Sequence, residues 1–186
     1  MDATPAPADA ARLEALFRAH YRDVAAYVRR RAEPDLVEDV VAETFLVAWR
    51  RLDEVPADAR PWLLGVARKT LATQRRSLAR RRSLLTKLEG AHRPSEREQS
   101  GELGVADALR RLSEKDREAI TLIAWEGLSP KDAALVAGQS PVAFRVRLHR
   151  AKRRLRAHLA TRERSREGTL ELAAGEVPLT GGGLKR

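Results

Sequence analysis

The sequence contains no cysteine, and only eight of its 186 residues are aromatic. Without cysteine the chain has no disulfide and no thiolate metal ligand, so a reducing cytoplasm is the expected compartment. With few aromatic residues, the core must be built from leucine, valine and alanine, which favours small helical bundles over a sandwich or barrel. No stretch reaches the roughly 20 apolar residues of a membrane span, so we expect no membrane insertion. Residues 1–11 contain Asp2 and Asp9 and no apolar run, so we do not expect them to act as a signal peptide.

The signatures of an enzyme are also missing. The four histidines are scattered, and no two have the spacing of a His-Glu-x-x-His metal site. No glycine-rich phosphate loop is present. We therefore expect no catalytic activity and no bound metal or cofactor.

Acidic residues are missing from two long stretches. Residues 59–88 carry nine lysines and arginines, residues 133–162 carry eight, and neither stretch has an Asp or Glu. The formal net charge is +10, yet the rest of the chain has 19 basic against 26 acidic residues. Solvated helix faces usually mix both signs. Two wholly basic stretches therefore favour contact with a long polyanion at two places over two solvated faces.

Apolar residues in the first half recur at the helical period of three and four residues. This pattern predicts helices over 11–32, 35–52 and 61–88, after residues 1–10, which we expect to be disordered. Pro34 separates the first two helices, and Pro61 suits the first turn of the third. Residues 90–104 mix Gly, Pro, Ser and charged residues, and this composition predicts a flexible linker.

Capping signals divide the second half. Ser129-Pro130-Lys131-Asp132 places serine at the N-cap, proline at N1 and aspartate at N3, and Ser113 and Ser140 begin similar signals. We expect a helix from Ser113 to Glu126, a short helix that ends at Gly138, and a long helix from Ser140 to about Ala160. The predicted fold is all-α, with two small helical domains (11–88 and 105–160) joined by a flexible linker (89–104) and followed by an unstructured tail (161–186).

The short helix, the turn at Gly138 and the long basic helix form a predicted helix-turn-helix. In such a motif the first residues of the second helix face base edges in the major groove. The candidate residues are Ser140, Pro141, Val142, Ala143, Arg145, Val146, Arg147 and Arg150. Arg145 is the best candidate for a bidentate contact with guanine. A helical bundle with a basic end that binds no DNA is the alternative.

Two further helices carry candidate surfaces. Basic residues accompany Trp62 on the third helix, and this combination can hold single-stranded DNA through phosphate contacts and base stacking. A tryptophan at this spacing is more often a core residue. The second helix carries four carboxylates, which form either a solvated face or a docking face for a basic protein surface. They are Asp35, Glu38, Asp39 and Glu43.

Four blocks of sequence resemble the sigma-70 family, in particular its extracytoplasmic-function (ECF) group. Residues 35–51 resemble region 2.2, and the stretch from Arg60-Pro-Trp-Leu-Leu-Gly onward resembles regions 2.3 and 2.4. Residues 112–120 resemble region 4.1, and residues 126–152 resemble region 4.2. The blocks occur in the family's order over about residues 11–160. The chain departs from common family residues at Ala42, Lys69, Thr73 and Val142-Ala143-Phe144.

The resemblance implies an alternative sigma factor that binds core RNA polymerase and directs transcription initiation at promoter DNA. Residues 11–88 would be sigma region 2, and residues 105–160 would be region 4, whose helix-turn-helix would recognise the −35 element. Docking on the clamp helices of the polymerase β′ subunit would use Asp35, Glu38, Asp39, Glu43 and Phe45. Recognition and opening of the −10 element would use the loop 53–60 and the third helix, with Arg60, Trp62, Arg68, Lys69, Thr73, Arg75 and Arg76. An anti-sigma protein is a typical partner in this group, and we expect the free chain to be monomeric.

Two other functions fit parts of the pattern. An ordinary helix-turn-helix regulator would bind an operator as a dimer, but it leaves the acidic helix and the first basic stretch unexplained. A basic helical RNA-binding protein would bind RNA in a salt-sensitive way without promoter activity. Run-off transcription with core polymerase, with and without the chain, separates the three functions.

Overall fold

The computed structural model describes residues 7–89 and 104–174, which consist of helices and the turns between them, with no β-strand in these ranges. The expected all-α class is confirmed. The elements are α1 (Pro7–Arg29), η1 (Pro34–Leu36), α2 (Val37–Arg50), η2 (Leu52–Glu54), α3 (Ala59–Glu89), α4 (Val105–Arg110), α5 (Glu114–Ala124), α6 (Pro130–Ala137) and α7 (Pro141–Ala174). One compact unit contains α1 to α3 and Thr121–Val146, and the other includes α4 and α7 from Arg147 onward.

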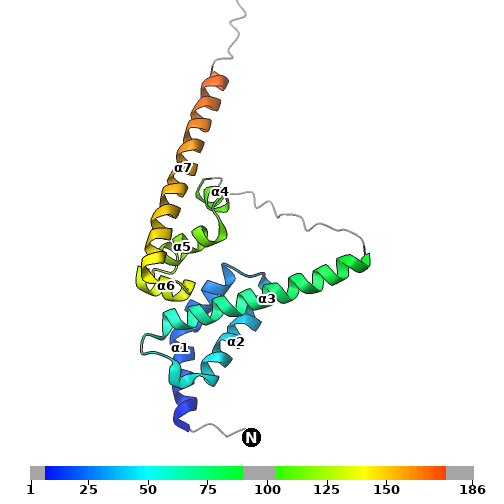
Figure 1. Ribbon diagram of the computed structural model, residues 1–186, viewed down its shortest axis with the longest axis vertical. Coiled ribbons are helices and arrows are strands. Elements are labelled where there is room, and N and C mark those ends of the chain that lie inside the picture. The colour runs from blue at the N-terminus through cyan, green and yellow to red at the C-terminus, as the bar shows by residue number, and fades with distance from the viewer. Residues whose placement is uncertain (1–6, 90–103, 175–186) are drawn as a thin grey trace, which may run out of the picture. The chain divides into compact units, whose positions relative to one another are not determined.

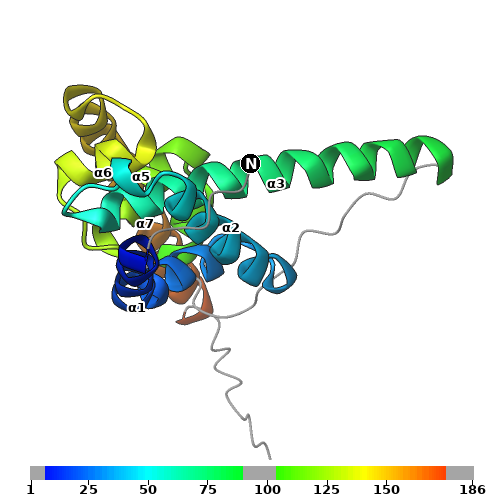
Figure 2. The same ribbon diagram turned by 90° about the horizontal axis from the view of Figure 1, so that it is seen from below.

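Helices α1, α2 and α3 pack against one another around a core of aliphatic residues (Figures 1 and 2). Each helix contributes a stripe at the three- and four-residue spacing that places side chains on one face. The buried residues include Val24 and Val28 of α1, Val40, Val41 and Ala48 of α2, and Leu63, Leu64, Ala67 and Leu71 of α3. Thr44 is the polar member of this core, and its Oγ1 donates to the Val40 carbonyl oxygen at 2.7 Å. That hydrogen bond satisfies a hydroxyl that would otherwise be costly to bury.

The boundaries of the first helices differ from the sequence-based expectation by a few residues. α1 begins at Pro7 within the stretch expected to be disordered, because proline is favourable in a first helical turn and Asp9 suits the positive end of the helix dipole. The second predicted helix is divided, since η1 precedes α2. α3 begins at Ala59, with Pro61 in its first turn, and ends at Glu89. The expected linker, apart from Glu89 and Gly104, lies outside the described residues.

The predicted caps of the second half are confirmed. The Oγ atoms of Ser113, Ser129 and Ser140 accept hydrogen bonds from the backbone N–H three residues later, each at 3.2 Å. Gly138 ends α6 with a φ of 65°, a left-handed conformation that favours glycine. The six-residue helix α4 was not expected, because it is too short to show a helical period.

The expected end of the last helix near Ala160 was wrong. In Figure 1, α7 continues as one helix beyond α4 and α5, and it ends at Ala174. Residues 161–174 contain no proline and only one glycine, so nothing in them stops a helix. The expected unstructured tail was therefore wrong for residues 161–174, and residues 175–186 lie outside the described part of the chain.

None of the described helices has the length and apolar character needed to cross a bilayer. Across residues 7–89 and 104–174, no group of three or more His, Asp or Glu side chains is placed to hold a metal ion.

Candidate protein and nucleic-acid interfaces

The acidic residues of η1 and α2 form a continuous face, which we call the acidic face. Its members follow the helical spacing of one side, and they are Asp35, Glu38, Asp39 and Glu43. The first three are exposed, whereas Glu43 is half-buried and lies 3.7 Å from the Nη1 of Arg50. Phe45, the fifth docking candidate, differs from them because it is only 6% exposed. Its ring packs against Phe17 with centroids 4.8 Å apart, so Phe45 holds α2 against α1 from inside.

An apolar cleft borders the acidic face. Phe17 and Tyr21 of α1 are large exposed aromatic residues with ring centroids 5.0 Å apart. The cleft is lined by these two rings and by Arg29, Ala32, Pro34, Val37, Glu38, Val41 and Ala42. Phe17 and Tyr21 fall within the apolar helical pattern of residues 11–32, and that pattern does not show that their rings stay exposed, so sequence reasoning missed this cleft. An apolar cleft beside carboxylates suits a basic amphipathic helix.

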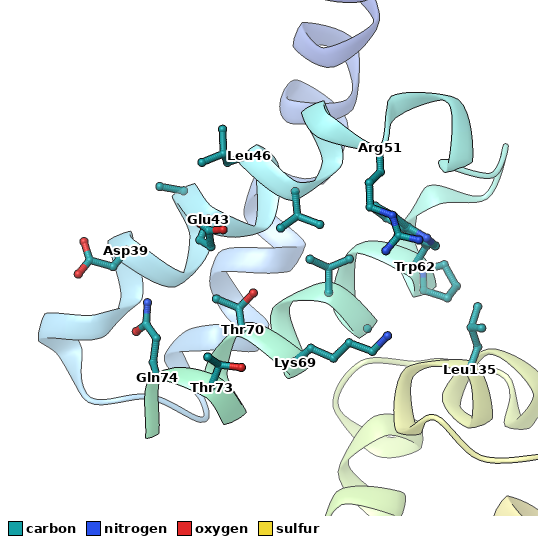
Figure 3. Close-up of a pocket in the computed structure, with 15 residues that line it drawn as sticks. Asp39, Glu43, Leu46, Arg51, Trp62, Lys69, Thr70, Thr73, Gln74 and Leu135 are labelled. Carbon is teal, nitrogen blue, oxygen red and sulfur yellow. The ribbon is translucent and has the colours of Figure 1, made fainter. Parts of the chain in front are cut away.

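A groove runs between α2 and α3 (Figure 3). Asp39, Glu43 and Leu46 reach it from α2, and the α3 side carries Trp62, Lys69, Thr70, Thr73 and Gln74. Three of the candidate −10 residues, Trp62, Lys69 and Thr73, are therefore brought together here. Thr70 and Gln74 were missed, because no charge or aromatic ring marks them in the sequence.

Arg51 shapes the mouth of this groove. Its guanidinium carbon lies 5.9 Å from the centroid of the Trp62 ring, and its Nε donates to Glu54 Oε1 at 2.9 Å. The hydrogen bond from Arg51 lowers the pKa of Glu54. The half-buried Trp62 thus presents an aromatic surface with a cation beside it, which is an arrangement suited to stacking with a base.

The remaining basic candidates of α3 lie in different surroundings. Arg60 Nε donates to Asp23 Oδ2 of α1 at 2.6 Å, which ties the start of α3 to α1. Arg75 donates to the carbonyl oxygen of Arg31. Arg76 is exposed and donates to the Ala72 carbonyl oxygen at 3.2 Å, while Arg68 is half-buried. The basic residues of α3 therefore fall into two groups. Lys69 lines the groove, whereas Arg60 and Arg75 make hydrogen bonds to other parts of the fold.

The helix-turn-helix consists of α6 and the first turns of α7. Phe144, Leu148 and Ala151 form the buried face of α7. The opposite, exposed face carries Val142, Arg145, Val146 and Arg150. A shallow cleft at the starts of the two helices is lined by Ser129, Pro130, Lys131, Pro141 and Arg145. Lys131 was not among the sequence candidates, although it sits in the first turn of α6 where a phosphate contact would be expected.

Arg147 differs from the other candidates on α7. Its Nη1 lies 3.8 Å from Oδ1 of Asp116 on α5, and Arg154 donates to the other carboxylate oxygen of Asp116. Asp116 is buried, so these two arginines neutralise a carboxylate that would otherwise be unpaired in the interior. Two arginines of the second basic stretch therefore connect α7 to α5 through Asp116.

Two family descriptions match the chain. Sigma-70 region 2 matches residues 16–81, and sigma-70 region 4 matches residues 103–155. RNA polymerase sigma factor NccH of Alcaligenes xylosoxydans xylosoxydans is 34% identical over 157 residues, which are 77% of this chain and 84% of that protein. ECF RNA polymerase sigma factor SigL of Mycobacterium tuberculosis is 33% identical over 164 residues, which are 83% of this chain and 92% of that protein.

Solved structures give the same family. The sigma factor RpoE of Bartonella quintana, in complex with the anti-sigma factor NepR, aligns with a TM-score of 0.59 and 27% identity over 79% of this chain and 96% of that one. CnrH in complex with the cytosolic domain of CnrY aligns with a TM-score of 0.54 and 28% identity over 80% and 88% of the two chains. With both sigma regions in order on a helical scaffold that carries the acidic face and the helix-turn-helix, the chain belongs to the ECF group of the sigma-70 family and is an alternative sigma factor that directs transcription initiation.

Proposed function

We propose that this sigma factor divides promoter recognition among three surfaces on separate helices. The acidic face of α2 docks on the clamp helices of the polymerase β′ subunit. The α3 wall of the groove, with Trp62, Lys69 and Thr73, holds unpaired −10 DNA, while Asp39 and Glu43 on the α2 wall belong to the acidic face. The start of α7 enters the major groove of the −35 element. The observation that carries this assignment is the separation of charge. η1 and α2 present four carboxylates on one side, whereas α3 from Ala59 to Leu88 and α7 from Pro141 to Ala160 contain no acidic residue.

The chemistry of each surface fits its assigned partner. Carboxylates repel DNA phosphates and attract a basic protein surface. The groove residues Trp62 and Lys69 combine a stacking platform with a cation, which suits single-stranded DNA. The exposed residues of α7 follow a serine-capped turn in helix-turn-helix order, which suits a duplex major groove. Binding to core polymerase and promoters accords with the cytoplasmic location expected from the sequence.

An anti-sigma protein is the fourth proposed partner. Two structural relatives, RpoE and CnrH, were solved with NepR and with the cytosolic domain of CnrY. The apolar cleft of Phe17 and Tyr21 offers this chain a place for such a partner. The free sigma factor is proposed to be monomeric. It needs no second copy to bind DNA firmly, because core polymerase holds its two modest DNA-binding surfaces at a fixed spacing and so lets them bind together.

Charge reversal on the acidic face tests the docking assignment. Asp39→Lys combined with Glu43→Lys should abolish most co-purification with core polymerase and most run-off transcription, since attraction becomes repulsion. Circular dichroism should show an unchanged helical fold, because Asp39 is exposed and the side chain of Glu43 is 44% exposed.

A matched control makes the same change of charge elsewhere. Glu14→Lys combined with Glu114→Lys alters two exposed carboxylates outside the acidic face. This variant should bind core polymerase as the unmodified chain does. If both double variants lose binding equally, net charge rather than the acidic face governs docking.

A further inference from the structure

Two exposed valines lie at the start of α7. Val142 is 65% exposed and Val146 is 46% exposed. Together with Arg145 they have the i, i+3, i+4 spacing that places side chains on one helix face. Phe144 and Leu148 are buried, so the core-facing side of α7 lies opposite the valines. Neither valine is therefore needed to fill the core.

Valine is an unfavourable choice at such a position. Its β-branched side chain has a lower helix propensity than alanine, and its methyl groups remain in water. Later turns of the same face carry exposed polar and basic residues instead, namely His149, Arg150 and Arg153. Apolar exposure is thus confined to the turns that approach base edges in a helix-turn-helix, whereas the basic turns lie where phosphates are expected.

The major groove offers one apolar group to such side chains, the C5-methyl of thymine. We propose that Val142 and Val146 recognise thymine methyl groups in the −35 element, on either strand, while Arg145 between them contacts guanine. The proposal rests on the proposed function, in which α7 enters the −35 major groove. It adds the chemical class of base that this chain selects there.

The spacing of the side chains limits where the thymines lie. Four residues of helix advance about 6 Å, at roughly 1.5 Å per residue. Successive base pairs are roughly 3.4 Å apart along the duplex. The two valines therefore span about two base-pair steps, so the recognised thymines should be about two base pairs apart, with the guanine contact of Arg145 beside them.

Charge favours DNA over a protein as the occupant of this face. Residues 133–162 contain no acidic side chain, and Arg145 and Arg150 lie among and beside the valines. An apolar patch within positive charge is complementary to a groove that is flanked by phosphates and carries methyl groups. A partner helix with basic residues would be repelled.

Deoxyuridine substitution tests the proposal with the smallest possible change, because it removes only the thymine methyl. A −35 library transcribed by core polymerase with this sigma factor first identifies the preferred element. Each thymine of that element, on either strand, is then replaced singly by deoxyuridine, and run-off transcription is measured for the unmodified chain, Val142→Ala and Val146→Ala. Val105→Ala is the matched control, since Val105 is 58% exposed on α4.

We expect deoxyuridine to lower transcription by the unmodified chain about three- to fivefold at two positions, as for one buried CH₂-sized group. Val142→Ala should abolish that sensitivity at one position and Val146→Ala at the other, while Val105→Ala should behave as the unmodified chain. Thermal unfolding should show no loss of stability in the alanine variants, since alanine is the better helix former.

Two results would overturn the inference. Equal transcription from thymine and deoxyuridine templates would show that the methyl groups are not recognised. Unchanged methyl sensitivity in both alanine variants would show that other residues recognise them. Either result leaves the proposed function standing if the library still yields a preferred −35 element, whereas a library without any preference would overturn the proposed function itself.

Discussion

The two basic helices of this sigma factor use similar composition in different ways. On α3, Trp62, Lys69 and Thr73 line a groove, and Arg60 is paired with Asp23 of α1. On α7, Arg145 lies on the exposed face at the start of the helix, whereas the guanidinium of Arg147 points to Asp116 of α5. A basic stretch therefore indicates a polyanion as partner, but acidic neighbours elsewhere in the fold decide which of its side chains remain available.

The largest effect is expected when the arginines of α7 that pair with the buried Asp116 are removed, because this tests whether they serve stability instead of DNA binding. Arg147→Ala combined with Arg154→Ala should lower the free energy of unfolding by about 3 kcal/mol, at the lower end for a broken buried ion pair because Arg154 is half-exposed. Urea denaturation measures the change. Adding Asp116→Asn should restore part of the lost stability, because no charge then stays buried without a partner. If the triple variant is less stable than the double variant, the arginines do not serve to neutralise Asp116.

The exposed side of α7 should respond in specificity rather than stability. Arg145→Ala should cost roughly 1–3 kcal/mol of discrimination at one base pair of the −35 element. Arg153→Ala, two turns further along the exposed face, should weaken all promoters about equally. Transcription from a library of −35 variants distinguishes the two patterns. If Arg145→Ala lowers transcription from every variant by the same factor, Arg145 does not contact a base.

A smaller loss of stability is expected when Arg60, which ties the start of α3 to α1, is removed. Arg60→Ala should lower the free energy of unfolding by about 1 kcal/mol, the upper end for a partly exposed ion pair. Asp23→Ala should cost somewhat less, because Arg60 also donates to the Glu126 carbonyl oxygen at 2.8 Å and keeps that hydrogen bond when Asp23 is removed. The double variant should be no worse than Arg60→Ala alone, since Asp23 has no ion-pair partner left to lose. Additive losses in urea denaturation would mean that the two residues act independently.

Local features of the fold were predictable from the sequence. The serine caps at Ser113, Ser129 and Ser140 and the turn at Gly138 depend on neighbouring residues, and all four were expected. The extension of α7 was missed, because the expected unstructured tail leaves out of account the composition of residues 161–174, which contain no proline and only one glycine.

Features that depend on distant residues were not predictable in this way. The pairing of Asp116 with Arg154 joins residues 38 apart, and helical periodicity does not indicate which charge lies opposite which. Phe45 was assigned to the docking surface from the family resemblance, yet packing against Phe17 places it inside. The groove between α2 and α3 exists only once these helices pack, so Thr70 and Gln74 had no signal of their own.

The division between α3 and α7 is tested most directly by a promoter whose −10 element is already unpaired by mismatches. Run-off transcription from duplex and pre-opened templates is compared for Trp62→Ala and Arg145→Ala. If Trp62 stabilises the unpaired strand by stacking, Trp62→Ala makes opening of the −10 element less favourable. A template that is already unpaired removes this cost, so the transcription defect of Trp62→Ala should be about tenfold smaller on it than on the duplex template. The defect of Arg145→Ala should be the same on both templates, because the −35 element stays double-stranded. Relief of both variants, or of neither, would contradict the assignment of unpaired DNA to α3 and duplex DNA to α7.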